Sequence, residues 1–344
     1  MKSFLSIFLF IFFLFLSSLS HRSIAADIDN FSQRHSLPPD AIVEVNKMIQ
    51  WSLLEAIRES YVAEEGCDGK KIRKRLRNKL GGSFTWSKIY LLILKNPNIT
   101  LQKISLKDSI YKNATFFTNP IVYFFFGEHL INLNGILIGT DKLEHLIDTG
   151  YMLFSYFHEG NHSYEKTLRY NEITETFYGK LTTFIYSYGD IVANIEGWRF
   201  WELLAYSPKD FSKISQKDPT KFLLKCESKQ GRSWWALNRP LDISPFINEG
   251  MDEAINCNHY TSYGFKTSVE KNLSSLSKQF PSKTWTCPVK VEACQKLQEY
   301  YKGPLGIHAL SPECLQAGQQ LAKNPKKNNP TLSSHSHFSS VLFP

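Results

Sequence analysis

The chain has 344 residues, of which 42% are hydrophobic, 21% charged and 14% aromatic. This composition is typical of a folded globular protein and excludes an intrinsically disordered one. The formal net charge is +8. Such a moderate basic excess is compatible with an anionic lipid or polysaccharide partner, and we expect no nucleic-acid partner.

The first 25 residues have the pattern of a cleavable secretory signal. Lys2 precedes an apolar run over residues 4–19, and Ser23-Ile24-Ala25 provides small residues before a cleavage site after Ala25. The run is shorter than the about 20 residues that cross a bilayer comfortably. We therefore expect a periplasmic or secreted protein with no transmembrane span after signal cleavage. An uncleaved anchor is the alternative.

The cysteine content points to an oxidising compartment. An even number of cysteines in an exported chain predicts disulfide bonds, here with about fifteen alternative pairings. No Cys-x-x-Cys pair is present, so we expect no cysteine-based zinc site. The six are Cys67, Cys226, Cys257, Cys287, Cys294 and Cys314.

Helical periodicity begins at Asp40, which lies near the start of a predicted helix. Its apolar face is formed by Ile42, Val45, Ile49, Leu53 and Ile57. Residues 69–82 predict a short basic amphipathic helix with seven lysines or arginines. This helix, centred on residues 70–80, could contact an anionic envelope surface. The alternative is a solvated helix that covers the core with Ile72, Leu76 and Leu80.

The remaining chain predicts a mainly α fold, an irregular helical bundle with a disulfide-bearing C-terminal part. Residues 83–140 mix helical and extended signals, whereas residues 141–206 are more clearly helical. We expect a helical core domain over 27–206 and a cysteine-containing helical part over 207–323 packed on it. Residues 324–344 are rich in Asn, Pro and Ser and predict a disordered tail.

The stretch His158-Glu159-Gly160-Asn161-His162 matches HExxH, the zinc signature of many metallopeptidases. That motif requires a continuous helix, and Gly160 and Asn161 are poor helix formers at its centre. The position of the metzincin third histidine holds Leu168. We therefore interpret the motif as a turn between helices, in which Gly160 ends one helix and Asn161 or Ser163 caps the next.

A stronger candidate site is formed by acids on apolar helices. Asp141, His145 and Asp148 are spaced to share one helical face. Acids and amides also occur on three other predicted apolar helices: Glu172 and Glu175, Asp190 and Asn194, and Glu249, Asp252, Glu253 and Asn256. Buried carboxylates need partners or a metal, so we expect the acids and His145 to converge on one polar centre.

Specific roles follow if this centre binds a divalent ion. The predicted ligands of the metal are Asp141, His145, Glu175 and Asp190. Glu172 is the predicted general base, and His145 would take part in catalysis. Binding of a small ligand or cofactor is assigned to Asn194, Asp252, Glu253 and Asn256.

A purely structural interpretation stays open beside the metal site. Asp141 could cap its helix, with Glu144 completing a capping box. Asp190 could cap the helix after Gly189, while Glu172 and Glu175 could lie on a solvated face.

The sequence resembles an uncharacterised group of exported proteobacterial proteins over roughly residues 135–260. The resemblance is carried by Asp141-Lys142 with His145, by Gly189-Asp190, Ala193-Asn194, Gly197 and Phe200-Trp201, and by Asp252-Glu253 with Asn256. It implies no particular activity. The Asp-Lys-x-x-His fragment is also similar to VanZ-like membrane proteins, but the missing spans argue against membership.

Two function hypotheses follow. One is a non-enzymatic exported protein whose polar centre organises the fold or holds a small ligand or metal. The other is a metal-dependent hydrolase that uses Asp141, His145, Glu175 and Asp190. A glycan hydrolase with paired acids is a further alternative.

Overall fold

The computed structural model describes residues 28–82, 87–116, 118–126, 129–181, 183–205 and 222–323. The expected signal peptide, the expected tail over 324–344 and most of the link between the two expected parts lie outside these residues. No helix among the described ranges is both long and apolar enough to cross a membrane.

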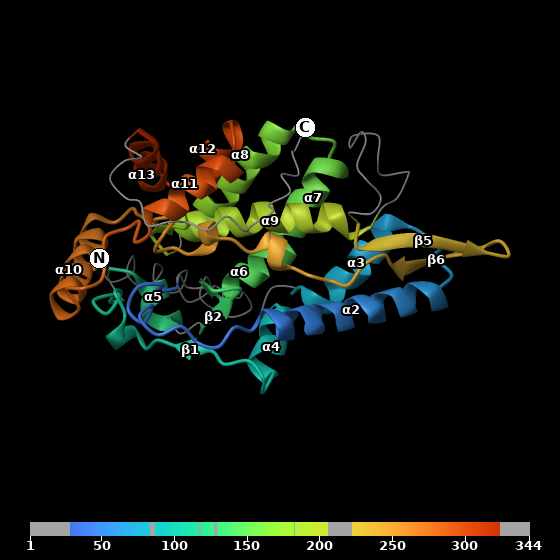
Figure 1. Ribbon diagram of the computed structural model, residues 1–344, viewed down its shortest axis with the longest axis horizontal. Helices are drawn as coiled ribbons and strands as arrows, with labels where there is room; N and C mark the ends of the chain where they lie inside the picture. The colour runs from blue at the N-terminus through green and yellow to red at the C-terminus, as the bar shows by residue number, and fades with distance from the viewer. Residues whose placement is uncertain are drawn as a thin grey trace, which may run out of the picture.

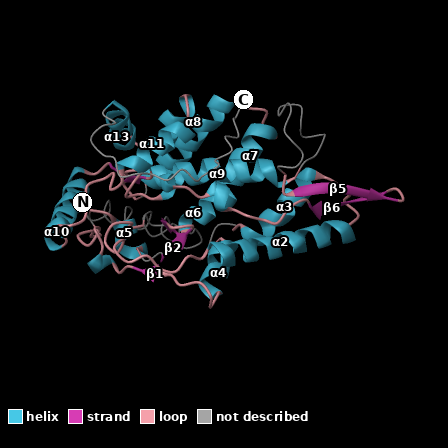
Figure 2. Cartoon of the chain, in the orientation of Figure 1, coloured by secondary structure: helices cyan, strands magenta, loops and turns pink. Residues whose placement is uncertain are grey.

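The expected mainly α fold is confirmed (Figure 1; Figure 2). The N-terminal half contains helices α2 (Ile42–Val62), α3 (Gly69–Leu80), α4 (Lys88–Lys95), α5 (Pro120–Phe125) and α6 (Asp141–Glu144). They are followed by α7 (Gly150–His158), α8 (Tyr164–Glu175) and α9 (Tyr188–Leu204). The C-terminal part holds α10 (Tyr263–Gln279), α11 (Val291–Tyr300), α12 (Pro304–Ala309) and α13 (Pro312–Lys323). Short 3-10 turns are η1 (Leu106–Asp108), η5 (Ser244–Phe246) and η6 (Glu249–Met251).

Helix α9 runs through the middle of the molecule, between α7, α8 and α11 on one side and α6 and α3 on the other (Figure 1). Nearly all of its residues are buried. It crosses the α6–α7 segment so closely that a Cβ atom on Gly197 would lie 2.1 Å from the Leu146 carbonyl oxygen. Only glycine permits this approach, because any side chain would push the two helices apart.

Helices α6 and α7 are joined by the π-helical turn η2 (His145–Thr149), so residues 141–158 form one interrupted helix. A second π-helical turn, η3 (Thr176–Lys180), follows α8. Single π-helical turns inside α-helices frequently mark functional sites. Both turns border the polar features described below.

Within the described ranges, three small antiparallel sheets complete the fold. They are β1 (Gln102–Lys103), β2 (His129–Leu133) and β3 (Ile136–Gly139); β4 (Ile185–Tyr186) with β7 (His259–Tyr260); and β5 (Leu224–Lys229) with β6 (Arg232–Leu237). The β2–β3 hairpin turns at Asn134 and Gly135, whose φ angles are 57° and 79°. An Asn-Gly pair between apolar runs is a strong hairpin signal. The mixed helical and extended signals of residues 83–140 do not predict this hairpin.

One main hydrophobic cluster includes residues from both sides of the expected boundary near 207, from Val45 and Trp201 to Leu297 and Cys314. The six cysteines form the bonds Cys67–Cys226, Cys257–Cys287 and Cys294–Cys314. The first bond links the two expected parts, and the other two lie within the C-terminal part. The expected disulfide-bearing C-terminal part is therefore confirmed.

The apolar face of the basic helix α3 lies in the core, where Ile72, Leu76 and Leu80 are fully buried. Five of its basic side chains interact with other elements. Arg73 donates to the carbonyl oxygens of Trp201 and Ala205 at the end of α9. The other four form ion pairs, Lys70 with Glu159, Arg75 with Glu65 and Glu59, Arg77 with Asp148, and Lys79 with Glu55 and Glu59.

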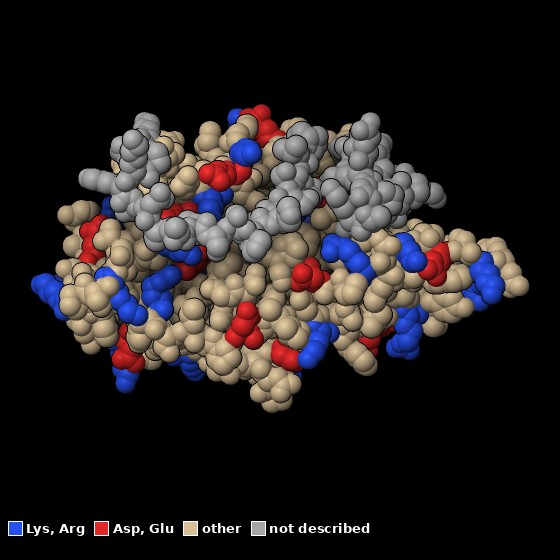
Figure 3. Space-filling model, viewed as in Figure 1, with Lys and Arg blue, Asp and Glu red and all other residues tan. Residues whose placement is uncertain are grey.

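On the face shown in Figure 3, basic and acidic side chains are interspersed at the end of the molecule where α2 and α3 lie. Contact of the basic helix with an anionic envelope surface stays a prediction.

Candidate functional site

The polar centre lies where the start of α6 and the turn η2 pack against the first turns of α9. Asp141 opens α6, His145 opens η2, and Asp190 lies in the first turn of α9. In contrast to the structural alternative, neither Asp141 nor Asp190 is the N-cap residue of its helix. Asp141 lies inside α6, after the N-cap residue Thr140, and Ser187 caps α9 by accepting a hydrogen bond from the Asp190 amide.

Asp141, His145 and Asp190 each offer one ligand atom within 4.8 Å of the other two. His145 Nε2 lies 3.3 Å from Asp190 Oδ2, and the two side chains are 21% and 11% exposed. Asp141 is 1% exposed. The expected buried centre of acids and one imidazole is therefore present, and His145 is the most exposed of the three side chains.

The organising residue of the centre is Lys142, which the sequence interpretation did not assign. Its side chain is fully buried, and its ammonium group lies 2.6 Å from Asp141 Oδ2, 2.6 Å from Asp190 Oδ1 and 2.5 Å from Glu253 Oε1. The sequence feature that indicates this role is the position of Lys142 in an apolar segment, because a buried lysine requires carboxylate partners.

These contacts shift the ionisation of each group. Burial lowers the pKa of Lys142, but the three carboxylates outweigh burial and hold it well above its usual range. Burial raises the pKa of Asp141 despite the neighbouring ammonium, and it raises the pKa of Glu253 to about 7. Asp190 is also buried, yet His145, in its protonated form, and Lys142 lower its pKa.

A chain of amides determines which nitrogen of His145 carries the proton. Asn171 Nδ2 donates to the Ile191 carbonyl, an atom that can only accept. Asn171 Oδ1 must then accept from Asn194 Nδ2 at 2.8 Å, which turns Asn194 Oδ1 toward His145 Nδ1 at 2.9 Å. His145 therefore donates from Nδ1, and in the neutral ring the lone pair of Nε2 faces Asp190.

Asp141 Oδ1 has no hydrogen-bond partner among the described residues, although the atom is buried. Space for this oxygen exists because residue 139 is glycine; a Cβ atom there would lie 2.1 Å from it. An unpaired buried carboxylate oxygen is costly unless a cation or a donor satisfies it.

Two further acids lie beside the centre. Burial and the charges of Asp141 and Asp148 raise the pKa of Glu144 to about 8. Asp148 accepts from the Gly82 amide and lies near Arg77, outside the Asp141–His145–Asp190 group. The turn η2 has a longer period than an α-helix, so the residues after His145 are rotated away from the face expected for a regular helix.

The other predicted ligand, Glu175, is buried next to the centre. Its Oε1 accepts from the Ser187 amide, and Ser187 Oγ donates to Glu253. Glu175 is not among the three residues whose ligand atoms meet. The predicted base Glu172 is hydrogen-bonded to His308, with 2.8 Å between Oε1 and Nδ1. A hydrolase mechanism with these residues stays a prediction.

Two of the residues assigned to ligand binding connect chain segments. Asp252 forms an ion pair with Arg34 at 3.0 Å and accepts from Asn30. Asn256 donates to the carbonyl oxygens of Tyr188, Gly250 and Ala309. By contrast, Asn194 and Glu253 do belong to the polar centre.

The HExxH stretch is a turn, as expected. Helix α7 ends at His158, and Ser163 caps α8 by accepting from the Lys166 amide. The left-handed residue of the turn is Asn161, with φ 52°, rather than Gly160. His158 and His162 have different neighbours, since His158 pairs with Glu202 at 3.2 Å and His162 packs on Tyr156.

The fold and the site together define a mainly α, disulfide-bonded protein with a buried Asp–His–Asp centre around a lysine. Comparison of the chain with family models, curated proteins and solved structures found no match. The resemblance to an exported proteobacterial group stays a prediction.

Proposed function

We propose that this chain is an exported metal-binding protein and that Asp141, His145 and Asp190 hold one divalent cation. The observation that carries the proposal is the convergence of their three ligand atoms within 4.8 Å of one another. Two of these atoms have capacity for a further partner. Asp141 Oδ1 is buried without a hydrogen-bond partner among the described residues, and the Asn194 contact leaves the Nε2 lone pair of neutral His145 available.

The charge of the centre also favours a cation. Lys142 contacts three carboxylates, those of Asp141, Asp190 and Glu253. When all four groups are ionised, one positive charge faces three negative ones, an excess of two negative charges in a buried site. A divalent ion neutralises this excess without displacing the ammonium, because Lys142 contacts Asp141 Oδ2 and Asp190 Oδ1 and leaves the second oxygen of each carboxylate to the metal.

The donor set narrows the choice of metal. Two carboxylate oxygens and one imidazole nitrogen suit manganese, iron(II) or zinc better than copper(I), which prefers sulfur ligands. The His145–Asn194–Asn171 chain is the kind of outer-shell support that orients a metal-binding imidazole. The side chain of His145 is 21% exposed, so an ion can reach the centre from solvent at this residue.

Metal content of protein purified without a histidine tag tests the proposal. We expect close to one equivalent of manganese, iron or zinc by elemental analysis, and we expect His145→Ala and Asp141→Asn to lose it. Calorimetric titration of the chelator-treated protein with Mn²⁺ and Zn²⁺ gives an independent measure. Metal-free protein that binds neither ion would refute the proposal and would leave the centre as a structural polar network.

The chain offers a matched control in His158, which also pairs with one carboxylate on α9 but has no third candidate ligand within the described part of the chain. His158→Ala should keep the metal, and so should Glu159→Gln in the HExxH turn, because Glu159 pairs with Lys70 at the surface. Loss of metal in these two variants and not in His145→Ala would instead place the ion at the HExxH turn.

A further inference from the structure

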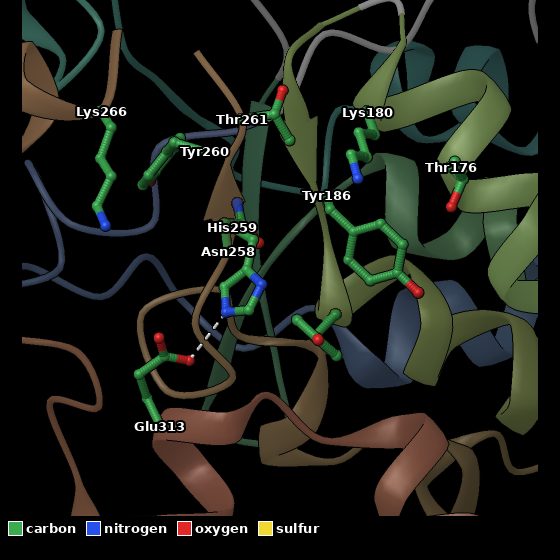
Figure 4. Close-up of a pocket in the computed structure, with 10 residues that line it drawn as sticks. Thr176, Lys180, Tyr186, Asn258, His259, Tyr260, Thr261, Lys266 and Glu313 are labelled. Atoms are coloured by element: carbon green, nitrogen blue, oxygen red, sulfur yellow. Dashed lines mark hydrogen bonds and ion pairs between the residues drawn. The ribbon is translucent and has the colours of Figure 1, made fainter. Parts of the chain in front are cut away.

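A cavity of about 460 Å³ lies apart from the metal-ligand group (Figure 4). Small-molecule sites commonly have volumes of about 300–1,000 Å³. The cavity is formed by the π-helical turn η3, the β4–β7 ribbon and the first turn of α13. Its lining residues are Thr176, Lys180, Tyr186, Tyr188, Asn258, His259, Tyr260, Thr261, Lys266 and Glu313.

One wall of the cavity is aromatic. The β4–β7 register places Tyr186 opposite His259, and directly opposite residues of a sheet point to the same face. Tyr188 packs edge-on against both rings, with centroids 5.0 Å from Tyr186 and 5.3 Å from His259. The arrangement presents a rigid set of rings to an incoming ligand.

A polar side chain of the lining, that of Asn258, is held in a fixed orientation. Asn258 Nδ2 donates to Glu253 Oε2 at 2.6 Å, which fixes the orientation of the amide. Its Oδ1 is buried and has no hydrogen-bond partner among the described residues. Threonine hydroxyls at positions 176 and 261 add further polar groups to the lining.

The charged groups favour an anion. Lys180 and Lys266 lie on opposite sides of His259 in Figure 4. The acid of the lining, Glu313, pairs with His259 at 3.2 Å and also interacts electrostatically with Lys266, which contacts Glu270 at 3.9 Å. Two further acids lie near Tyr186, and both have partners: Glu172 is hydrogen-bonded to His308, and Glu175 accepts from the Ser187 amide. Two lysines therefore face one paired carboxylate.

We infer that this cavity binds an anionic saccharide, a sugar ring that carries a carboxylate or a phosphate. The ring stacks on the tyrosines, its hydroxyls bond to polar groups of the lining, and the acidic group lies between Lys180 and Lys266. The inference does not depend on the metal site, because none of Asp141, His145 and Asp190 lines the cavity.

The test is calorimetric titration of the full mature chain with glucuronate, glucose 6-phosphate, glucose and inorganic phosphate. We expect both acidic sugars to bind at least about tenfold more tightly than glucose and than phosphate. The double variant Lys180→Ala/Lys266→Ala should weaken their binding about tenfold or more, and Tyr186→Leu should weaken it several-fold. Lys271→Ala, an exposed lysine of α10 outside the cavity, is the control and should bind like the wild type.

Each alternative result is informative. Equal binding of glucose and glucuronate would overturn the anionic part of the inference. Binding of phosphate as tight as that of the acidic sugars, and unaffected by Tyr186→Leu, would overturn the saccharide part. Absence of binding by every sugar at about 10 mM, with circular dichroism showing a folded protein, would overturn the inference as a whole.

Discussion

Lys142 Nζ lies 2.6 Å from Asp190 Oδ1, in a position where neither side chain is more than 11% exposed. This contact ties the start of α6 to the first turn of α9, and the 2.5 Å contact of the same ammonium with Glu253 adds the segment after η6. Three distant segments of the chain are thus joined by one buried cation. The metal group is built on the remaining carboxylate oxygens of this network.

Replacement of this lysine should separate fold stability from metal affinity. Lys142→Met leaves three carboxylates without their cation, so we expect a loss of about 3–5 kcal/mol in the free energy of unfolding of metal-free protein. The same change makes the site more negative, so added Mn²⁺ should raise the melting temperature more in the variant than in the wild type. Thermal unfolding with and without the metal measures both effects. A variant that is destabilised but does not respond to metal would contradict the proposed site.

The tautomer of His145 can be observed directly. In metal-free protein at a pH where the imidazole is in its neutral form, ¹⁵N spectra should show Nδ1 protonated and Nε2 unprotonated, because Asn194 Oδ1 accepts from Nδ1 at 2.9 Å. Asn194→Leu removes this acceptor, and we expect it to weaken metal binding about 10–100-fold, as loss of an outer-shell partner typically does. A signal from the opposite tautomer would show that the amide chain does not orient the ring.

The close crossing of α9 with η2 predicts a strong effect at Gly197. A Cβ atom at this position would lie 2.1 Å from the Leu146 carbonyl oxygen, so Gly197→Ala should destabilise the protein by about 1–3 kcal/mol or more. Gly264 in α10 is the control, since a Cβ atom there would meet nothing within 4 Å. Gly264→Ala should be neutral or stabilising by up to about 1 kcal/mol. Urea unfolding measures the difference, and equal effects of the two changes would rule out the close crossing.

The ion pair between Glu65 and Arg75 predicts a pH-dependent stability. Two hydrogen bonds of 2.7 Å from Arg75 lower the pKa of Glu65 below its usual value of 4.5. Since the folded state holds this carboxylate ionised more strongly than the unfolded state does, the stabilisation is complete above pH 4.5 and is lost as the pH falls toward the lower folded pKa.

Urea unfolding of the wild type and Glu65→Gln at two pH values measures this contribution. The variant should be less stable by about 1 kcal/mol at neutral pH, and the difference should shrink at about pH 3. Glu270→Gln, at an exposed pair 3.9 Å from Lys266, should change stability by at most a few tenths of a kcal/mol at either pH. A Glu65 effect that did not change with pH would argue against an ionic origin.

Local features of the fold could be predicted because they depend on neighbours in sequence. The four-residue spacing of Ile72, Leu76 and Leu80 predicted the buried face of α3, which the structure confirms. The glycine and asparagine of the HExxH stretch predicted a break between helices, which is also found. The Asn134-Gly135 signal was equally local and was missed only because the surrounding segment mixes helical and extended patterns.

Only part of the candidate site could be predicted from the sequence. Asp141, His145 and Asp190 were expected to meet because charged groups on apolar helices need partners, and their ligand atoms do lie together. The place of Asp148 could not be predicted, because it depends on a π-helical turn that periodicity does not reveal. Glu172 and Asp252 contact His308 and Arg34, which lie far away in the sequence.

The sequence by itself determined the mainly helical class of the fold, the presence of disulfide bonds, and the presence of buried acids that require compensation. Only the tertiary structure decided which cation compensates them, which acids converge and which cysteines are joined. The physical reason is that burial and periodicity act over a few residues, whereas an ion pair such as Lys142–Glu253 depends on how distant segments pack in three dimensions.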